Sequence, residues 1–366
     1  MSRSMDEQFM RQALAGAQAA VHRTSPNPTV GCVIVAGDRV VGRGVTQPFG
    51  HSHAEVMAIA EAGEQARGAR MYVTLEPCCH VGKTPPCTSA IIDAGIAEVL
   101  VGVIDPNPLV HGKGLTLLKE AGIRVSQGVL AMECSAHHAP FCQFIRSGRP
   151  WVTIKGAMTL DGQIATVSGD SKWITCQASR TDVHGLRAQV DAVLVGAETA
   201  RIDNPRLNVR LAQGEDPVRV VLDSKASLEP TAALMGAGTL IFIGPDAPAQ
   251  RVDAIRGTGA EVIRVPLNTY GLQVESVLEI LGSRGIVHLL VEGGGHIHRS
   301  LLDQRLADEA CIYIAPKLLG QGRPLLPGPG VEKIEEAYTL TDVQITTFGD
   351  DVRVRGQIKY PESRST

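Results

Sequence analysis

Short apolar runs alternate with amphipathic stretches through the first third of the chain. Four strands are predicted, at 30–35, 39–44, 71–76 and 98–105. Four helices are predicted, at 1–22, 53–66, 87–95 and 115–122. The first two strands are expected to pair around Gly37 and Asp38, and the last two helices to end at Gly95 and Gly122. This alternation predicts helices that cover a mostly parallel sheet.

The second part of the chain repeats the alternation with different motifs. Strands are predicted from 151 and at 192–198, 218–224, 239–244, 262–266, 287–295 and 310–319. Helices are predicted at 180–190 and 274–285, and a hairpin at 343–360. Between Glu133 and Pro150 the periodicity is lost, and the stretch RSGRP indicates a connector. We therefore expect two α/β domains, 1–148 and 149–366.

Composition restricts the class of protein. A chain of 366 residues exceeds what one core usually serves, which agrees with two domains. The net charge of −3 gives no general attraction to nucleic acid or anionic membranes, so a small-molecule substrate is favoured. The first residues lack a signal-peptide pattern, and no run approaches the roughly 18 apolar residues of a membrane span. Because the eight cysteines form no disulfide framework, we expect a cytoplasmic protein.

The segments HSHAEV and LEPCCHVGKTPPC carry the clearest chemistry. His53, Cys78 and Cys87 are predicted to bind zinc and to leave a fourth position for water, whose pKa zinc lowers. Glu55 is a poor ligand beside two thiolates but a good acid/base, so we expect it to carry protons. Cys79 is a rival ligand. If it joined the other three, the site would be closed and structural.

This arrangement resembles the HxE and PCxxC signature of zinc-dependent nucleoside and nucleobase deaminases. Position 81 is Val81, and the next usable thiol after Cys78 is Cys87, nine residues on. That longer spacing resembles the deaminase of riboflavin biosynthesis. The resemblance assigns the metal to Cys78 and Cys87 and implies a cytidine-deaminase-like three-layer α/β/α domain.

Clusters in the second part resemble the reductase domain of the same pathway, which has a dihydrofolate-reductase-like α/β fold and uses NADPH. They are KGAMTLDGQIA, DSKWITCQASRTDVHGLRA and VGAETARIDNPRLNVR. The stretch VHLLVEGGGHIHRSLL is compatible with this, because an apolar strand, a three-glycine turn and a helix start leave backbone amides free for a phosphate. The resemblance implies an NADPH site formed by Ala157, Trp173, Thr199, Asp203, Ser224, Gly293, Gly294 and Gly295. It implies a substrate site formed by Ser171, Arg187, Leu207, Arg210 and Glu292. Lys155 and Asp203 are the candidates for catalysis, with their division of roles left open.

Together the two resemblances imply a bifunctional riboflavin biosynthesis enzyme, a diaminohydroxyphosphoribosylaminopyrimidine deaminase and 5-amino-6-(5-phosphoribosylamino)uracil reductase. Zinc hydroxide would deaminate 2,5-diamino-6-(5-phosphoribosylamino)pyrimidin-4-one, and NADPH would then reduce the ribosyl group to ribityl. Asn27, His80 and Lys83 are proposed substrate contacts of the deaminase. The family commonly has a histidine where this chain has Thr46, and His51 is the candidate substitute. Family members assemble into homo-oligomers, which we expect here too.

Other interpretations of these residues remain open from sequence alone. One is a nucleoside or RNA deaminase fused to an unrelated module, although an aromatic content of 4% offers little for base stacking. Another is a binding or scaffolding protein with structural zinc. Asn27 alone could be a turn residue, Lys83 and the two arginines could be surface charges, and Trp173 could be a core residue. A second metal site at His184, His296 and His298 is disfavoured, because no cysteine or carboxylate array accompanies them.

Overall fold

The chain divides into two compact units, one up to Arg149 and the other from Pro150 onward. The structure, a computed structural model, describes residues 3–20 and 24–361. The outermost residues of the predicted first helix (1, 2, 21 and 22) and residues 362–366 of the predicted second domain lie outside these ranges. None of the helices in the described ranges combines the length and apolar character needed to cross a bilayer.

Unit 1 is built on a five-stranded sheet. Its strands in spatial order are β2 (Arg39–Val45), β1 (Gly31–Ala36), β3 (Arg70–Leu75), β4 (Glu98–Val103) and β5 (Arg124–Gln127). The pairs β3–β4 and β4–β5 are parallel, whereas β1 is antiparallel to both β2 and β3. Four of the five strands therefore run in one direction, as the sequence predicted, and β1 alone runs against them. The turn at Gly37 reverses the chain after β1, as the sequence predicted.

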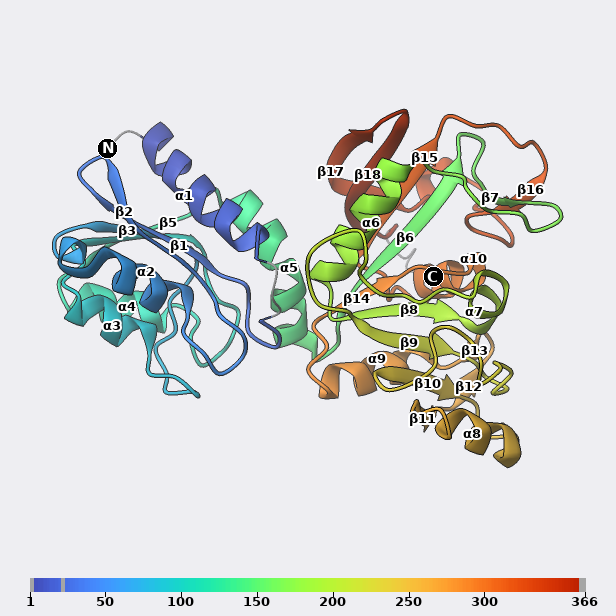
Figure 1. Cartoon of the computed structure of the whole chain (residues 1–366). Coiled ribbons are helices and arrows are strands. Elements are labelled where there is room, and N and C mark those ends of the chain that lie inside the picture. Colours follow the sequence, from blue (N-terminus) through green and yellow to red (C-terminus); the bar gives the residue numbers. More distant parts are fainter. Residues whose placement is uncertain (1–2, 21–23, 362–366) are drawn as a thin grey trace. The chain divides into compact units, whose positions relative to one another are not determined.

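Helices cover both faces of this sheet, giving three layers (Figure 1). They are α1 (Arg3–Gln18) and α5 (Ala131–Ser147) on one face, and α2 (Ala54–Ala62), α3 (Cys87–Asp93) and α4 (Lys113–Glu120) on the other, with a 3₁₀ turn at Gly63–Ala66. Alternate strand residues supply the two cores, since side chains of a strand alternate between faces. In β1, Cys32 and Ile34 pack with α2, whereas Val33 and Val35 pack with α1.

The 17-residue helix α5 contradicts the predicted loss of regular structure between Glu133 and Pro150. Its buried positions Cys134, His138 and Phe141 have helical spacing. One of the three is a histidine and Pro140 lies inside the helix, which concealed the period in the sequence. His138 is accommodated because its Nε2 lies 3.0 Å from the hydroxyl of Thr74, and burial lowers its pKa so that it stays neutral.

Unit 2 is built on a nine-stranded sheet. Its strands in spatial order are β11 (Glu261–Arg264), β10 (Thr239–Ile243), β9 (Val218–Leu222), β8 (Ala192–Gly196), β14 (His288–Val291), β6 (Trp151–Thr159), β15 (Glu309–Ala315), β18 (Asp351–Lys359) and β17 (Thr339–Phe348). In this spatial order, each strand from β11 through β10, β9, β8, β14 and β6 to β15 is parallel to its neighbours. The predicted C-terminal hairpin β17–β18 adds two antiparallel strands. The sequence did not indicate two small pairs, β7 (Gln163–Thr166) with β16 (Gly322–Pro324) and β12 (Leu267–Asn268) with β13 (Gly271–Leu272).

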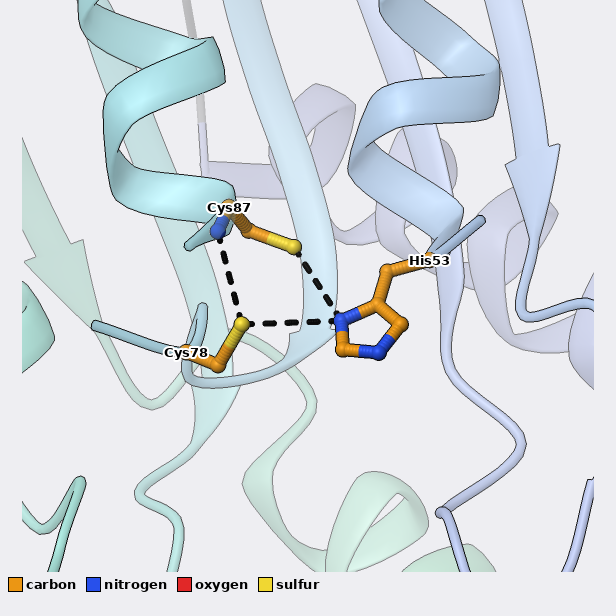
Figure 2. Close-up of side chains that lie close together, drawn as sticks. All are labelled: His53, Cys78 and Cys87. Atoms are coloured by element: carbon orange, nitrogen blue, oxygen red, sulfur yellow. Dashed lines mark hydrogen bonds between the residues drawn. The ribbon is translucent and has the colours of Figure 1, made fainter. Parts of the chain in front are cut away.

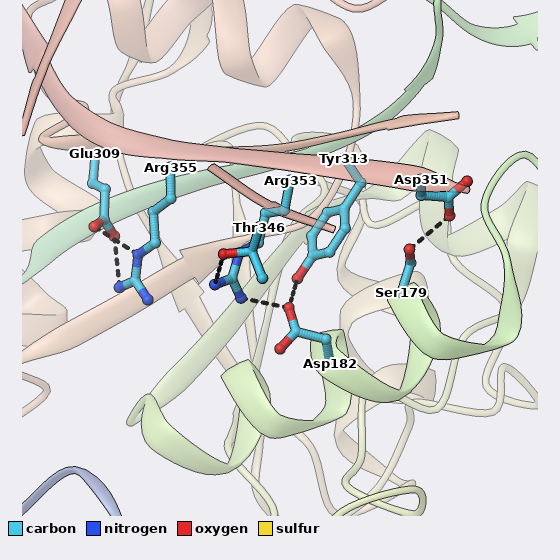
Figure 3. Close-up of polar contacts among 8 residues, drawn as sticks. All are labelled: Ser179, Asp182, Glu309, Tyr313, Thr346, Asp351, Arg353 and Arg355. Atoms are coloured by element: carbon cyan, nitrogen blue, oxygen red, sulfur yellow. Dashed lines mark hydrogen bonds and ion pairs between the residues drawn. The ribbon is translucent and has the colours of Figure 1, made fainter. Parts of the chain in front are cut away.

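Helices also cover both faces of the second sheet. Core contacts place α6 (Gln177–Gln189), α7 (Ala197–Asp203) and α8 (Ala249–Arg256) on one face, and α9 (Val274–Ser283) and α10 (Gly295–Asp303) on the other. A 3₁₀ turn spans Ile334–Glu336. Figure 3 shows two contacts that join the hairpin to α6, Asp351 with Ser179 and Arg353 with Asp182. Asp182 of α6 accepts hydrogen bonds from Tyr313 at 2.5 Å and from Arg353 at 2.6 Å.

Candidate active sites

Three metal-binding side chains converge in unit 1 (Figure 2). His53 directly precedes α2, Cys78 lies in the loop after β3, and Cys87 is the first residue of α3. His53 Nδ1 lies 3.5 Å from Cys78 Sγ and 3.3 Å from Cys87 Sγ. Their donor atoms all lie within 4.8 Å of one another, a spacing that one zinc ion between them would satisfy.

Cys79 points away from this group. Its thiol donates to the carbonyl oxygen of Leu109 at 3.6 Å. Among the described residues, His53, Cys78 and Cys87 are the group that brings three such donors together. A zinc ion here would have three protein ligands and room for a water, which fits a catalytic site and not a closed structural one.

The pKa values of the two thiols are shifted in opposite directions. Hydrogen bonding from Cys87, and then from His53, lowers the pKa of Cys78 to about 4. The pKa of Cys87 is raised, first by its hydrogen bond to Cys78 and then by burial. These neighbours favour the thiolate form of Cys78, which is the form that binds a metal ion.

Glu55 lies in the first turn of α2, which begins at Ala54 between the histidine and the glutamate. Its side chain is only 3% exposed. Burial, assisted by the charge of Cys78, raises its pKa to about 7. A carboxyl group with a pKa near neutrality can both accept and donate a proton during a reaction cycle.

A cavity of about 440 Å³ opens beside the metal ligands. Its wall includes all three proposed deaminase contacts, Asn27, His80 and Lys83, and also Thr46 and His51. This volume falls in the range of small-molecule sites. The five positions are thus brought together although they are spread over 57 residues of sequence.

Sequence reasoning missed several cavity residues. Glu76 directly follows strand β3 and Asp105 comes two residues after the parallel strand β4, positions where α/β folds place ligands, and this was the available signal. Burial raises the pKa of Asp105 to about 6. Phe49 lines the cavity under Lys83, whose Nζ lies 4.7 Å from the ring centre. Phe141 comes from α5, which the sequence pattern did not reveal.

The predicted residues of unit 2 gather at one edge of its sheet. Thr199, Ser224 and Gly293 each come shortly after the carboxyl ends of neighbouring parallel strands, β8, β9 and β14. A Cβ atom added to Gly293 would lie 2.8 Å from the Thr199 side chain, so these two segments touch. Gly294 has a φ of +82° at the start of α10, which favours glycine there. A glycine turn followed by a helix N-terminus at the end of a parallel strand suits the phosphates of a dinucleotide.

A buried ion pair lies beside this edge. Arg187 Nε donates to Glu292 Oε1 at 2.6 Å, and a second guanidinium nitrogen donates to Oε2 at 2.9 Å. Burial lowers the pKa of Lys155, although the charge of Glu292 opposes the change. Arg210 is exposed, and Asn208 accepts a hydrogen bond from its guanidinium at 3.3 Å. Arg187 is therefore already paired, whereas Arg210 projects towards solvent.

The remaining predicted residues of unit 2 differ in how accessible their side chains are to a ligand. Leu207 is 1% exposed and packs in the core, so only its backbone is available for a ligand. Trp173 is 61% exposed, so its interpretation as a core residue is wrong. Ser171, Ala157 and Asp203 are partly exposed. Lys172 Nζ donates to the carbonyl oxygen of Asp203 at 3.4 Å, which ties the Trp173 loop to the end of α7.

Two family models match the chain. They are the cytidine and deoxycytidylate deaminase zinc-binding region over residues 3–103 and the RibD C-terminal domain over residues 150–354. The riboflavin biosynthesis protein RibD of Bacillus amyloliquefaciens is 41% identical over 356 residues, or 96% of this chain and 95% of that protein. The chain belongs to the RibD family. The RibD relative from Aquifex aeolicus is 39% identical and covers 96% of the chain and 98% of its own length.

Solved RibD structures share the whole fold. RibD of Acinetobacter baumannii superposes with a TM-score of 0.84 at 36% identity, covering 98% of this chain and 100% of that one. A Thermotoga maritima protein described as a diaminohydroxyphosphoribosylaminopyrimidine deaminase and 5-amino-6-(5-phosphoribosylamino)uracil reductase gives 0.83 at 35% identity, covering 98% and 99%. The predicted fold classes are confirmed.

As a RibD family member, the chain is a bifunctional deaminase and reductase of riboflavin biosynthesis. Unit 1 is the deaminase unit and unit 2 the reductase unit. The unrelated-module and scaffolding interpretations are thereby excluded.

Proposed function

We propose that the deaminase unit hydrolyses the amino group of 2,5-diamino-6-(5-phosphoribosylamino)pyrimidin-4-one, and that the reductase unit then converts the ribosyl group of the product to ribityl with NADPH. The observation that carries the first step is the buried Glu55 beside an open set of one imidazole and two sulfur donors, at the wall of a 440 Å³ cavity. The description of the Thermotoga maritima relative as a diaminohydroxyphosphoribosylaminopyrimidine deaminase and 5-amino-6-(5-phosphoribosylamino)uracil reductase supports this choice of substrates.

In the deaminase unit, His53, Cys78 and Cys87 would hold the metal. When bound, zinc lowers the pKa of a water molecule towards neutrality. Glu55 would accept one proton of that water and pass it to the ring nitrogen, and would later pass the second proton of the same water to the departing ammonia. The raised pKa of Glu55, caused mainly by burial, suits a group that must carry a proton in both directions.

The cavity would bind the rest of the substrate. Asn27 could read an edge of the pyrimidine, since its amide offers both donors and an acceptor. Nδ1 of His80 is a buried atom without a hydrogen-bond partner in the described structure, so a ligand atom there would satisfy it. Lys83 supplies a cation for the phosphate group.

In the reductase unit, Thr199, Ser224 and the turn at Gly293 to Gly295 would hold NADPH, with Ala157 and Trp173 nearby. When bound, this cofactor supplies the hydride. Lys155 would polarise the sugar oxygen or donate a proton to it, and Asp203 would act with it. The lowered pKa of Lys155, caused by burial, favours proton donation at a physiological pH.

Substrate binding in the reductase unit would use the other predicted residues, Ser171, Arg187, Leu207, Arg210 and Glu292. Arg210 is the better phosphate ligand, because Arg187 is held by Glu292. The Arg187–Glu292 pair would instead present a rigid polar surface to the pyrimidine or the sugar.

The proposal also includes a cytoplasmic location and assembly into a homo-oligomer. All eight cysteines are free thiols, which supports a reducing cytoplasm. Assembly into a homo-oligomer is supported by the edge strand β17, where Val343 is 49% and Ile345 69% exposed. Sedimentation of the purified chain tests the assembly directly.

The deciding experiment follows two products with zinc-loaded chain and the phosphoribosylaminopyrimidine. Ammonia is measured first without NADPH, and NADPH oxidation is measured after the cofactor is added. We expect ammonia in the first stage and NADPH oxidation only after deamination. Oxidation of NADPH with substrate that has kept its amino group would contradict the proposed order.

A further inference from the structure

Glu76 is a buried carboxylate in the wall of the deaminase cavity that the proposed chemistry does not use. It follows β3 directly and precedes Pro77 and the metal ligand Cys78. Its own backbone N–H continues the pairing with β4 by donating to the carbonyl oxygen of Val103 at 2.9 Å. The residue is therefore fixed to the sheet on one side and to the metal loop on the other.

The Glu76 carboxylate accepts hydrogen bonds from four backbone N–H groups. Oε2 accepts from Asp105 at 3.3 Å and from Gly112 at 2.9 Å. Oε1 accepts from Gly114 at 3.1 Å and Leu115 at 3.4 Å. Gly114 and Leu115 are in the first turn of α4, where N–H groups have no acceptor within the helix. A carboxylate at this position also complements the positive end of the helix.

Oε2 of Glu76 accepts hydrogen bonds from the backbone N–H groups of both Asp105 and Gly112. Glu76 therefore holds the two ends of the segment between them close together. This segment, residues 105–112, supplies Asp105, Asn107 and Val110 to the cavity wall. The thiol of Cys79 reaches the same segment at Leu109. The side chains of Glu76 and Cys79 thus join the metal loop to this wall of the cavity.

We propose that Glu76 is a positioning residue, which holds the 105–112 wall of the cavity at a fixed place relative to the metal loop. The inference rests on the proposed use of the cavity as the pyrimidine site. Glu76 does not act as an acid or base, since its oxygens are already engaged by backbone donors. Its removal should loosen substrate binding more than it slows chemistry.

The packing at Gly114 supplies an independent way to disturb the same contact. A Cβ atom at Gly114 would lie 2.3 Å from the carbonyl oxygen of Pro77 and 3.2 Å from Glu76 Oε1. Gly114→Ala therefore pushes α4 away from the metal loop without changing any charge. Glu120→Gln, at the exposed end of the same helix, makes the same chemical change as Glu76→Gln and leaves the contact intact.

The test compares Glu76→Gln, Gly114→Ala and Glu120→Gln in the full chain loaded with zinc. A glutamine offers one acceptor oxygen, so one pair of N–H groups loses its partner. In the first two variants, we expect faster hydrogen exchange of the 104–115 backbone amides. We also expect a deaminase KM raised roughly 10- to 100-fold, similar in size to the loss of activity when an outer-shell partner of a metal site is removed. Zinc content, and reductase activity on deaminated substrate, should stay unchanged. Glu120→Gln should match the unaltered chain.

Three results would overturn the inference. One is unaltered exchange of the 104–115 amides in Glu76→Gln. Another is a fall in kcat without a rise in KM, which would indicate an acid/base role. The third is loss of zinc and of amide protection throughout the deaminase unit, which would make Glu76 a folding residue. If the unaltered chain fails to deaminate the substrate, the proposed substrate is wrong, while the exchange of these amides still tests Glu76.

Discussion

At the scale of single residues, Glu55 is the side chain on which deamination depends most directly. Glu55→Gln keeps the shape of the side chain but removes its ability to accept and return a proton. We expect kcat for ammonia release to fall about 100- to 10,000-fold, the usual contribution of a positioned acid/base. Zinc content should be unchanged, because Glu55 is not one of the proposed ligands.

The reductase unit provides the control for this variant. Glu55→Gln supplied with deaminated substrate should oxidise NADPH at the unaltered rate. Full ammonia release from Glu55→Gln with zinc bound would show that another group carries the proton.

Adjacent Cys78 and Cys79 should respond oppositely to the same substitution. Cys78→Ser removes a thiolate whose pKa is already lowered by its hydrogen-bonding neighbours, and zinc affinity should fall by more than the roughly 10- to 100-fold cost of an outer contact. Cys79→Ser should keep its zinc, since Cys79 contacts Leu109. Zinc content after dialysis against a chelator measures both. Equal loss from the two variants would mean that Cys79 is also a ligand.

The sequence pointed to the three side chains that gather at the candidate metal site because they are close together in the chain and chemically distinctive. It predicted less about Glu76 and Asp105, since a single acidic residue after a strand has no unusual spacing. Nor could it show that Arg187 and Glu292, 105 positions apart, form an ion pair. Such partners are determined by the topology of the sheet, which no local pattern contains.

At the scale of elements, a chain of polar contacts crosses four adjacent strands of the reductase sheet. Arg355 of β18 donates to Glu309 of β15, and Thr153 of β6 donates to the same carboxylate at 2.8 Å. Because the only hydroxyl proton of Thr153 is used there, Nε2 of His288 on β14 must donate to Thr153 across 2.9 Å. A neutral histidine with its proton on Nε2 is sufficient to complete this chain.

Burial lowers the pKa of His288 to about 4, against about 6.5 in an unfolded chain. Between these values the unfolded state binds a proton that the folded state does not. The free energy of unfolding should therefore fall as the pH falls from about 6.5 to about 4, by up to about 1.4 kcal/mol per pH unit from this residue. His288→Gln keeps a donor and should flatten that dependence.

Urea unfolding at several pH values, followed by tryptophan fluorescence, measures this effect. The chain has two tryptophans, Trp151 and Trp173, and both lie in the reductase unit. An unaltered pH slope in His288→Gln would show that His288 does not contribute to it.

Elements with a clear hydrophobic period were predictable, and the others were not. Strands β1, β3 and β4 have nearly continuous apolar residues, and the hairpin β17–β18 has a turn between two strands. Helix α5 escaped prediction because a buried histidine replaces an apolar residue at one of its core positions. The antiparallel placement of β1 beside β3 depends on which strands become neighbours, and strand composition does not specify that.

At the scale of the whole molecule, each unit has its own sheet and its own core clusters. Removal of zinc should therefore destabilise the deaminase unit alone. Metal-binding free energy contributes to the stability of the state that binds. With a chelator present, the fluorescence transition of the two tryptophans should keep its midpoint, while the loss of helical circular dichroism should begin earlier. A shift of both transitions would reveal energetic coupling between the units.

Separate units also predict that the two half-reactions can be supplied by different chains. Glu55→Gln lacks the first activity, and Lys155→Met should lack the second. A mixture of the two variants should release ammonia and oxidise NADPH at rates close to those of the unaltered chain at the same site concentration. No NADPH oxidation by the mixture would mean that the intermediate passes only within one chain.

The metal ligands and Glu55 occupy 35 consecutive residues, from His53 to Cys87, and the segment that Glu76 holds ends by Leu115. The deaminase unit is complete at Arg149, before any strand of the nine-stranded sheet exists. During synthesis, domains fold in order from the N-terminus. The nascent chain can thus capture its zinc while the ribosome is still translating the reductase, so metal supply acts on this enzyme at the first stage of its production.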